Sequence, residues 1–254
     1  MSPLRRLLKF LGGNFNLAQQ AWRETLTRPF YGDLVIEQVF QIGVRSFPLV
    51  IIVALSVGMV MALQFGVGLA KFGGKFYVPK IVSMSIVREL GPAFASLMMA
   101  ARVGAGITSE VGSMKVTEQI DAIRALGTSP IKKIVIPRVL ACLITVPILA
   151  IMANTVGIAG GLAVGVFDLQ LDPSFYLNKI FDTIKIVDYL SGFVKTFAFA
   201  IFIAIPACYY GMNVKGGTQG VGIATTKSVV VSCILIVIGD FFLTKLLIVV
   251  ESWL

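Results

Sequence analysis

Five long apolar stretches dominate this chain of 254 residues and limit the folds that it can adopt. They lie near 46–70, 77–107, 134–166, 190–212 and 221–250, and each has the roughly 20 mostly apolar residues that a helix needs to cross a bilayer. Charged residues make up only 14% of the chain, against roughly a quarter in soluble domains. The sequence therefore predicts an all-α integral membrane protein with five transmembrane helices.

The distribution of charge between the loops predicts the orientation. Five spans would put the N-terminal segment, 102–138 and 213–227 on one side of the membrane, and these segments carry most of the lysines and arginines. Such loops stay in the cytoplasm, so we expect a cytoplasmic N-terminus and a C-terminus outside. The net charge of +9 then follows from topology. A nucleic-acid-binding protein would instead need a basic face on a soluble module, which the sequence does not indicate.

Residues 1–30 have the pattern of an amphipathic helix that lies on the membrane surface. Apolar residues recur at helical spacing, at Leu4, Leu7, Leu8, Leu11, Phe15 and Trp22. The other sides carry Arg5, Arg6, Lys9, Asn16, Gln19, Gln20 and Arg23. A basic polar side with an aromatic at its boundary is typical of interfacial helices. The alternative is a helix that packs on a soluble partner.

The second apolar stretch contains two adjacent ionisable residues, Arg88 and Glu89. Charges inside a span are costly and are kept mainly where they serve a substrate path or a partner. Because adjacent helical residues point about 100° apart, the pair cannot neutralise itself, and at least one member needs another partner. Pro92 cannot donate to the Arg88 carbonyl, so we also expect a kink here. The alternative is a structural ion pair or a tether at a dimer interface.

The segment between the second and third stretches predicts a short helix near 117–127. Thr117 can cap it, Glu118 and Asp121 suit its first turn, and Gly127 with Pro130 can end it. Its apolar residues are Ile120, Ile123, Ala125 and Leu126, which leaves four polar residues outward for a docking protein: Glu118, Gln119, Asp121 and Arg124. The alternative is a solvated connector.

Four motifs together resemble the MlaE family of permeases in Mla/MCE lipid transport systems. They are Arg88-Glu89-Leu90-Gly91-Pro92, Ala101-Arg102-Val103-Gly104-Ala105-Gly106, Glu110-Val111-Gly112 and Thr117-Glu118-Gln119. The likeness extends to the amphipathic N-terminal helix and to Leu63-Gln64 in the first span, so it implies a single permease domain over 1–254. In that family the permease moves phospholipid between the inner membrane of a bacterium and a periplasmic carrier, which supports the lipid asymmetry of the outer membrane.

The resemblance also implies partners and site residues. The partners are a second copy of the permease, an MlaF-like ATPase that binds ATP and Mg, an MlaD-like periplasmic hexamer of MCE domains, and an MlaB-like STAS-domain protein. Residues expected to bind phospholipid are Arg88, Glu89, Gln64, Leu69 and Phe72. Residues expected to couple to the ATPase are Glu110, Glu118, Gln119, Asp121 and Arg124.

The chain itself does not have the residues of an ATPase or a hydrolase. It has no P-loop and no histidine, so we expect no cofactor, metal or catalytic site in this chain and ATP hydrolysis in a separate subunit. Two other functions remain open at this point. One is an ABC permease for a small solute, which would have more polar spans, and the other is a membrane scaffold that transports nothing.

Overall fold

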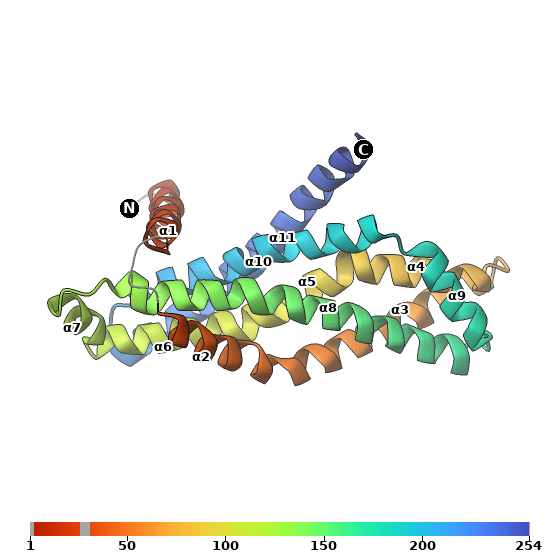
Figure 1. Cartoon of the computed structure of the whole chain (residues 1–254), viewed down its shortest axis with the longest axis horizontal. Coiled ribbons are helices and arrows are strands. Elements are labelled where there is room, and N and C mark those ends of the chain that lie inside the picture. Colours follow the sequence, from red (N-terminus) through yellow and green to blue (C-terminus); the bar gives the residue numbers. More distant parts are fainter. Residues whose placement is uncertain (1–2, 26–30, 254) are drawn as a thin grey trace. The chain divides into compact units, whose positions relative to one another are not determined.

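The computed structural model describes residues 3–25 and 31–253, with the side chains of 3–7 and 9 left out. Helices make up the described secondary structure (Figure 1). Five of them are long and apolar enough to cross a membrane: Gly32–Ala70, Lys75–Val116, Ile131–Phe167, Ile186–Met212 and Gly217–Glu251. The all-α, five-span prediction is confirmed, and the chain is a multi-pass membrane protein.

The chain divides into two compact units. Unit 1 comprises 1–45, 99–145 and 199–236, and unit 2 comprises 46–98, 146–198 and 237–254. Helices that lie wholly in unit 1 are α1 (Pro3–Thr25), α2 (Gly32–Ile42), α6 (Ala105–Val116) and α7 (Gln119–Ala125). Unit 2 contains α3 (Phe47–Ala70), α4 (Val78–Ser85) and α9 (Pro173–Thr183), and α5 (Gly91–Met99) belongs to it except for its last residue. Residues of both units belong to α8 (Ile136–Phe167), α10 (Ile186–Met212) and α11 (Gly217–Glu251). The prediction of a single permease domain remains a prediction.

Helix α1 has one buried side and one exposed apolar side. Leu17 and Ala21 are buried in unit 1, and the Ser129 hydroxyl donates to the Glu24 carboxylate at 2.6 Å. Four residues of the predicted apolar stripe are exposed: Leu8, Leu11, Phe15 and Trp22. The side chains of Leu4, Arg5, Arg6, Leu7 and Lys9, and residues 26–30, lie outside the described part. An exposed apolar stripe fits a helix on a membrane surface, and that location stays a prediction.

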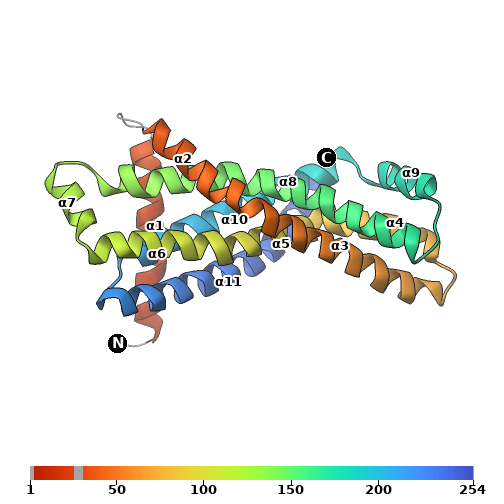
Figure 2. The ribbon, with the colours of Figure 1, turned by 90° about the horizontal axis from the view of Figure 1, so that it is seen from below.

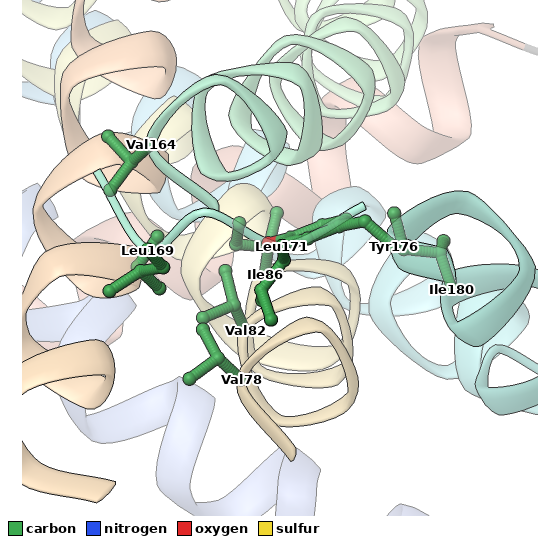
Figure 3. Close-up of a cluster of buried hydrophobic side chains, with 9 residues drawn as sticks. Val78, Val82, Ile86, Val164, Leu169, Leu171, Tyr176 and Ile180 are labelled. Carbon is green, nitrogen blue, oxygen red and sulfur yellow. The ribbon is translucent and has the colours of Figure 1, made fainter. Parts of the chain in front are cut away.

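Unit 2 has an apolar core between α4, the end of α8 and α9 (Figure 3). Helices α4 and α9 lie side by side in Figures 1 and 2. Tyr176 of α9 is only 1% exposed, and its burial raises the pKa of its hydroxyl to about 12. A Cβ atom on Gly165 would overlap the Tyr176 ring. The small residue therefore allows α9 to pack closely on α8.

The helix that contains the second span is longer than the predicted apolar stretch, and it is not regular throughout. Its helix runs from Lys75 to Val116, with two π-helical turns, η3 (Ile86–Leu90) and η4 (Ala100–Gly104). The kink expected near the charges therefore corresponds to a π-helical turn, which is a usual place for helix irregularity. The helix extends to Val116, beyond the predicted apolar stretch, and the end of the membrane span near 107 stays a prediction. The helix continues past polar Ser109 and Glu110, and Val111 in this part packs against Gly211 within unit 1.

Candidate functional site

Arg88 of the second span is held by two carboxylates of unit 2. Its Nη1 atom lies 2.7 Å from Asp188 Oδ1, and its Nη2 atom lies 2.9 Å from Glu251 Oε2. Asp188 belongs to the first turn of α10, and Glu251 ends α11. Asp188 Oδ2 also accepts from the Lys185 backbone N–H at 3.0 Å. Arg88 therefore joins the second, fourth and fifth spans of the chain through charge-assisted hydrogen bonds.

Glu89 is paired with a lysine that the sequence reasoning missed. Lys195 of α10 places its Nζ atom 2.6 Å from Glu89 Oε2 and 3.2 Å from Asp240 Oδ1. The same ammonium donates to the Thr244 hydroxyl at 2.6 Å. The Lys195 side chain is 0% exposed, so its charge is compensated wholly by protein oxygens. A buried charge needs such compensation because it has lost its hydration.

The π-helical turn explains how Lys195 reaches this position. Pro92 has no N–H to donate to the Arg88 carbonyl, and Lys195 Nζ donates to that oxygen at 3.2 Å. One turn earlier on α10, a Cβ atom on Gly192 would overlap the Val87 carbonyl. Glycine at this position therefore lets α10 approach the irregular turn closely enough for Lys195 to bond its backbone.

We call these seven residues the charge network of unit 2: Arg88, Glu89, Asp188, Lys195, Asp240, Thr244 and Glu251. It contains two cationic and four acidic side chains, so its net charge is −2 when every group is ionised. The positive charge of Arg88 is therefore balanced by carboxylates of the protein. Two protein carboxylates bind its guanidinium, and its expected role in binding phospholipid stays a prediction.

A cavity of about 710 Å³ opens beside Arg88 in unit 2. It is lined by Lys80, Met84, Arg88, Lys179, Asp182, Thr183, Lys185, Val187, Asp188 and Glu251. Its volume falls within the range of small-molecule sites. The acidic partners of Arg88 form part of its wall, and lysines of α4 and α9 form another part.

The structure does not bring the other three candidates for binding phospholipid, Gln64, Leu69 and Phe72, to this cavity. Gln64 is exposed on α3, and Leu69 packs against the apolar core of unit 2. Phe72 follows α3 and is 86% exposed. None of these three residues lines the cavity beside Arg88. Their role in binding phospholipid stays a prediction, as does that of Arg88 and Glu89.

The helix predicted near 117–127 is present as α7 (Gln119–Ala125), but it begins differently from the expectation. Thr117 does not cap it, because the Thr117 hydroxyl donates back to the Ser113 carbonyl at 3.0 Å. Glu118 is the residue before the helix, and its φ of 60° is left-handed. Glu118 lies between α6 and α7, in a backbone region that non-glycine residues adopt infrequently.

The end of α7 agrees with the prediction. Gly127 has a φ of +73°, its N–H donates to the Arg124 carbonyl, and the Thr128 N–H donates to the Ile123 carbonyl. This pair of bonds is the Schellman motif, which places glycine in the left-handed position. The expected glycine stop is therefore confirmed.

The polar residues of the α7 segment are exposed as expected: Glu118, Gln119, Asp121 and Arg124. Asp121 lies 2.7 Å from Lys115 Nζ and 3.4 Å from Arg124 Nη1. The hydrogen bond from Lys115 is the main cause that lowers the pKa of Asp121. Ile120 is buried, whereas Leu126 is 82% exposed, so the inward position expected for Leu126 is wrong. Leu126 is the C-cap residue and follows the last residue of α7, Ala125.

Glu110, which was expected to couple to the ATPase, pairs with a buried arginine. It lies on α6, and its Oε1 atom is 2.7 Å from Nη2 of Arg138 on α8. The Arg138 side chain is 5% exposed and also donates to the Ile134 carbonyl at 2.8 Å. Glu110 therefore compensates a buried arginine of unit 1, and its role in coupling stays a prediction.

Comparisons with known proteins agree with the motifs in the sequence. The family model described as "Permease MlaE" matches residues 35–246. A probable ABC transporter permease protein of Rickettsia felis is 41% identical over 95% of each chain. A probable ABC transporter permease protein of Synechocystis is 36% identical over 84% of this chain and 81% of its own. The intermembrane phospholipid transport system permease protein MlaE of Haemophilus influenzae is 32% identical over 84% of this chain and 82% of its own.

Proposed function

This chain belongs to the MlaE family of ABC transporter permeases, and from this premise we propose that it moves phospholipid between the inner membrane of a bacterium and a periplasmic carrier. The name of the Haemophilus influenzae relative supports the choice of phospholipid. Membership of an ABC permease family implies an ATPase partner. We propose an MlaF-like ATPase, a second copy of this chain, an MlaD-like MCE hexamer and an MlaB-like STAS-domain protein as the other components.

The observation that carries the proposal is the charge network of unit 2. Six ionisable side chains meet around one π-helical turn in the second span. A fold that needed only stability would place apolar residues there at little or no loss, because desolvation offsets much of the attraction within a buried ion pair. Ionisable groups retained within spans indicate a substrate path or a moving element.

The arrangement of the network suggests how it would serve transport. Arg88 and Glu89 come from one span, whereas their partners come from α10 and α11. A shift of the second span along α10 or α11 must exchange these pairs, which makes the network suited to two discrete arrangements. With net charge −2, it also suits a cationic head group such as ethanolamine. Glu89 would then alternate between Lys195 and the substrate amine.

We propose that ATP hydrolysis reaches this network from the α7 segment. Glu118, Gln119 and Arg124 are exposed there, and Leu126 exposes an apolar side chain beside them. An apolar anchor with charged neighbours is a suitable docking surface. We further propose that this segment lies in the cytoplasm with the N-terminus, that the C-terminus lies in the periplasm, and that transport supports outer-membrane asymmetry.

Replacement of Glu89 by glutamine tests the proposed function. The change keeps the size of the side chain and removes the charge that pairs with Lys195. We expect the Glu89→Gln permease to co-purify with its ATPase and to lose most of its lipid transfer between proteoliposomes and a periplasmic carrier. Glu37→Gln is a matched control, because Glu37 is bonded at an exposed position to Gln41, and it should transfer lipid normally.

Two results would contradict this proposal. Normal lipid transfer by Glu89→Gln would remove the network from the transport path. Failure of Glu89→Gln to assemble, with Glu37→Gln intact, would assign the network to the fold alone. A complex that transfers no lipid even with the unmodified chain would overturn the phospholipid assignment itself.

A further inference from the structure

The cavity beside Arg88 contains cationic groups that the charge network does not use. Lys80 of α4, Lys179 of α9 and Lys185 before α10 all line it. Within residues 3–25 and 31–253, the ammonium groups of these three lysines have no ion pair. They contrast with Arg88, which two carboxylates bind in the wall of the same cavity.

The remaining wall has the composition of a zwitterion site. Asp182 lines the cavity and forms no ion pair among the described residues. Three unpaired lysines and one unpaired aspartate leave a net charge of +2 outside the Arg88 group. Met84 and Val187 add apolar surface to the same wall. The cavity thus combines an anion-attracting side, one carboxylate and an apolar patch.

The position of the cavity in the chain corresponds to head-group depth. Lys80 is five residues after the start of the second span at Lys75, and Lys185 directly precedes the fourth span at Ile186. Helix α9, which carries Lys179, lies between the third and fourth spans. Lysines near the ends of spans extend their ammonium groups toward the membrane–water interface, where lipid phosphates lie.

We propose that this cavity binds the phosphodiester of a phospholipid head group, with Lys80, Lys179 and Lys185 as its phosphate ligands. The inference rests on the proposed function and deepens it, because it assigns phosphate recognition to three lysines that form no ion pair within the described part of the chain. An amine at the other end of the head group faces Asp182 and Glu251. The acyl chains leave past Met84 and Val187.

The test compares lipid binding by the purified permease–ATPase complex and by variants of the cavity. Phosphatidylethanolamine bound to the complex is measured by native mass spectrometry and by titration with a fluorescent analogue. We expect Lys179→Gln/Lys185→Gln to weaken binding by tenfold or more, on the order expected when charge-assisted hydrogen bonds to phosphate are lost. The arginine variant Lys179→Arg should retain binding, since it keeps the charge.

Matched controls separate the cavity from general surface charge. Lys71→Gln and Lys245→Gln each remove an exposed lysine of unit 2 that does not line the cavity. Both should bind lipid as the unmodified complex does. An equal loss in these controls, or no loss in Lys179→Gln/Lys185→Gln, would overturn the proposal. Co-purification of the ATPase with each variant verifies that the permease is folded.

The source of the phosphate is tested with three further ligands. Diacylglycerol lacks the phosphodiester and should not bind at the cavity, whereas glycerophosphoethanolamine should compete weakly. Inorganic phosphate that displaced lipid at equal concentration would overturn the assignment to a lipid. The outcome is separable from that of the proposed function. Loss of lipid binding in Lys179→Gln/Lys185→Gln, in a complex that transfers no lipid even when unmodified, would retain the site and reject transport. Unchanged lipid binding in Lys179→Gln/Lys185→Gln, where the unmodified complex transfers lipid and Glu89→Gln does not, would retain the proposed function and reject the site.

Discussion

The charges of the unit 2 network and those of the α7 segment differ in how completely the protein satisfies them. Lys195 is 0% exposed and bonds four oxygen-bearing groups of the protein. Arg124 is 65% exposed and lies 3.4 Å from a single carboxylate. An exposed pair of this kind contributes little to stability, so its charge remains usable by another molecule. A buried charge is tied to its own chain, and only a rearrangement of that chain can release it.

The largest expected effect follows from removing Lys195. The Lys195→Met change leaves Glu89 and Asp240 without their shared cation, and the loss of one partner from a buried ion pair costs about 3–5 kcal/mol. We expect a clear fall in the thermal unfolding temperature in detergent, whereas Lys245→Met, at an exposed site of α11, should change it little.

A second variant separates charge from packing at this site. The triple change Lys195→Met, Glu89→Gln and Asp240→Asn removes the two orphaned carboxylates as well. It should recover much of the lost stability and remain inactive in lipid transfer. If Lys195→Met unfolds at the same temperature as the unmodified protein, Lys195 does not stabilise the charge network.

An intermediate effect is expected at Glu118, on binding rather than on stability. Glu118→Lys keeps a side chain in the left-handed conformation and reverses an exposed charge, so ATPase co-purification should fall while the permease stays folded. Glu118→Gly relieves a backbone conformation that costs roughly 1 kcal/mol and should raise stability slightly, yet it should also weaken docking. Normal ATPase binding by both variants would disprove the docking assignment. Asp121 is a poorer choice for charge reversal, because it is bonded to Lys115.

The smallest expected effect is the pH dependence of the α7 segment. The pKa of Asp121 is lowered in the folded chain, chiefly by Lys115. Its contribution to local stability is therefore present above its ordinary pKa near 3.8 and disappears as the pH falls through the lower folded value. Hydrogen exchange of the α7 amides, corrected for the intrinsic pH effect, should quicken slightly on acidification to about pH 3. An Asp121→Asn chain should lack this response, and equal responses in both chains would exclude the Lys115 pair as its cause.

Hydropathy sufficed to predict the five spans, but it could not identify the partners of Arg88 and Glu89. A span can be recognised from its local composition. The partners of Arg88 cannot, because Asp188 and Glu251 are separated from it by 100 and 163 residues. Lys195 and Asp240 could have been found from the sequence, because they are ionisable residues within apolar stretches, the same signal that singled out Arg88. The three cavity lysines gave no such signal, since lysines near the ends of spans are common.

The sequence predicted the end of α7 correctly but not its start. The glycine stop at Gly127 follows from backbone sterics, and the sequence predicted it correctly. The start did not follow, because the Thr117 hydroxyl can bond either forward to a new helix or back to Ser113, and in the structure it bonds back. The helix of the second span shows the same limit, because Val111, beyond the predicted apolar stretch, packs against Gly211 in a contact that hydropathy does not measure.

The π-helical turn at Ile86–Leu90 affects how the second span should be mapped by labelling or cross-linking. Such a turn accommodates one residue more than an α-helical turn does, so the angular position of every later side chain is displaced by about one residue, or roughly 100°. A helical wheel drawn continuously from Val78 to Met98 would therefore assign wrong faces to the residues after Leu90. Cysteine pairs and spin labels between Val78 and Met98 need two helical wheels, one on each side of this turn.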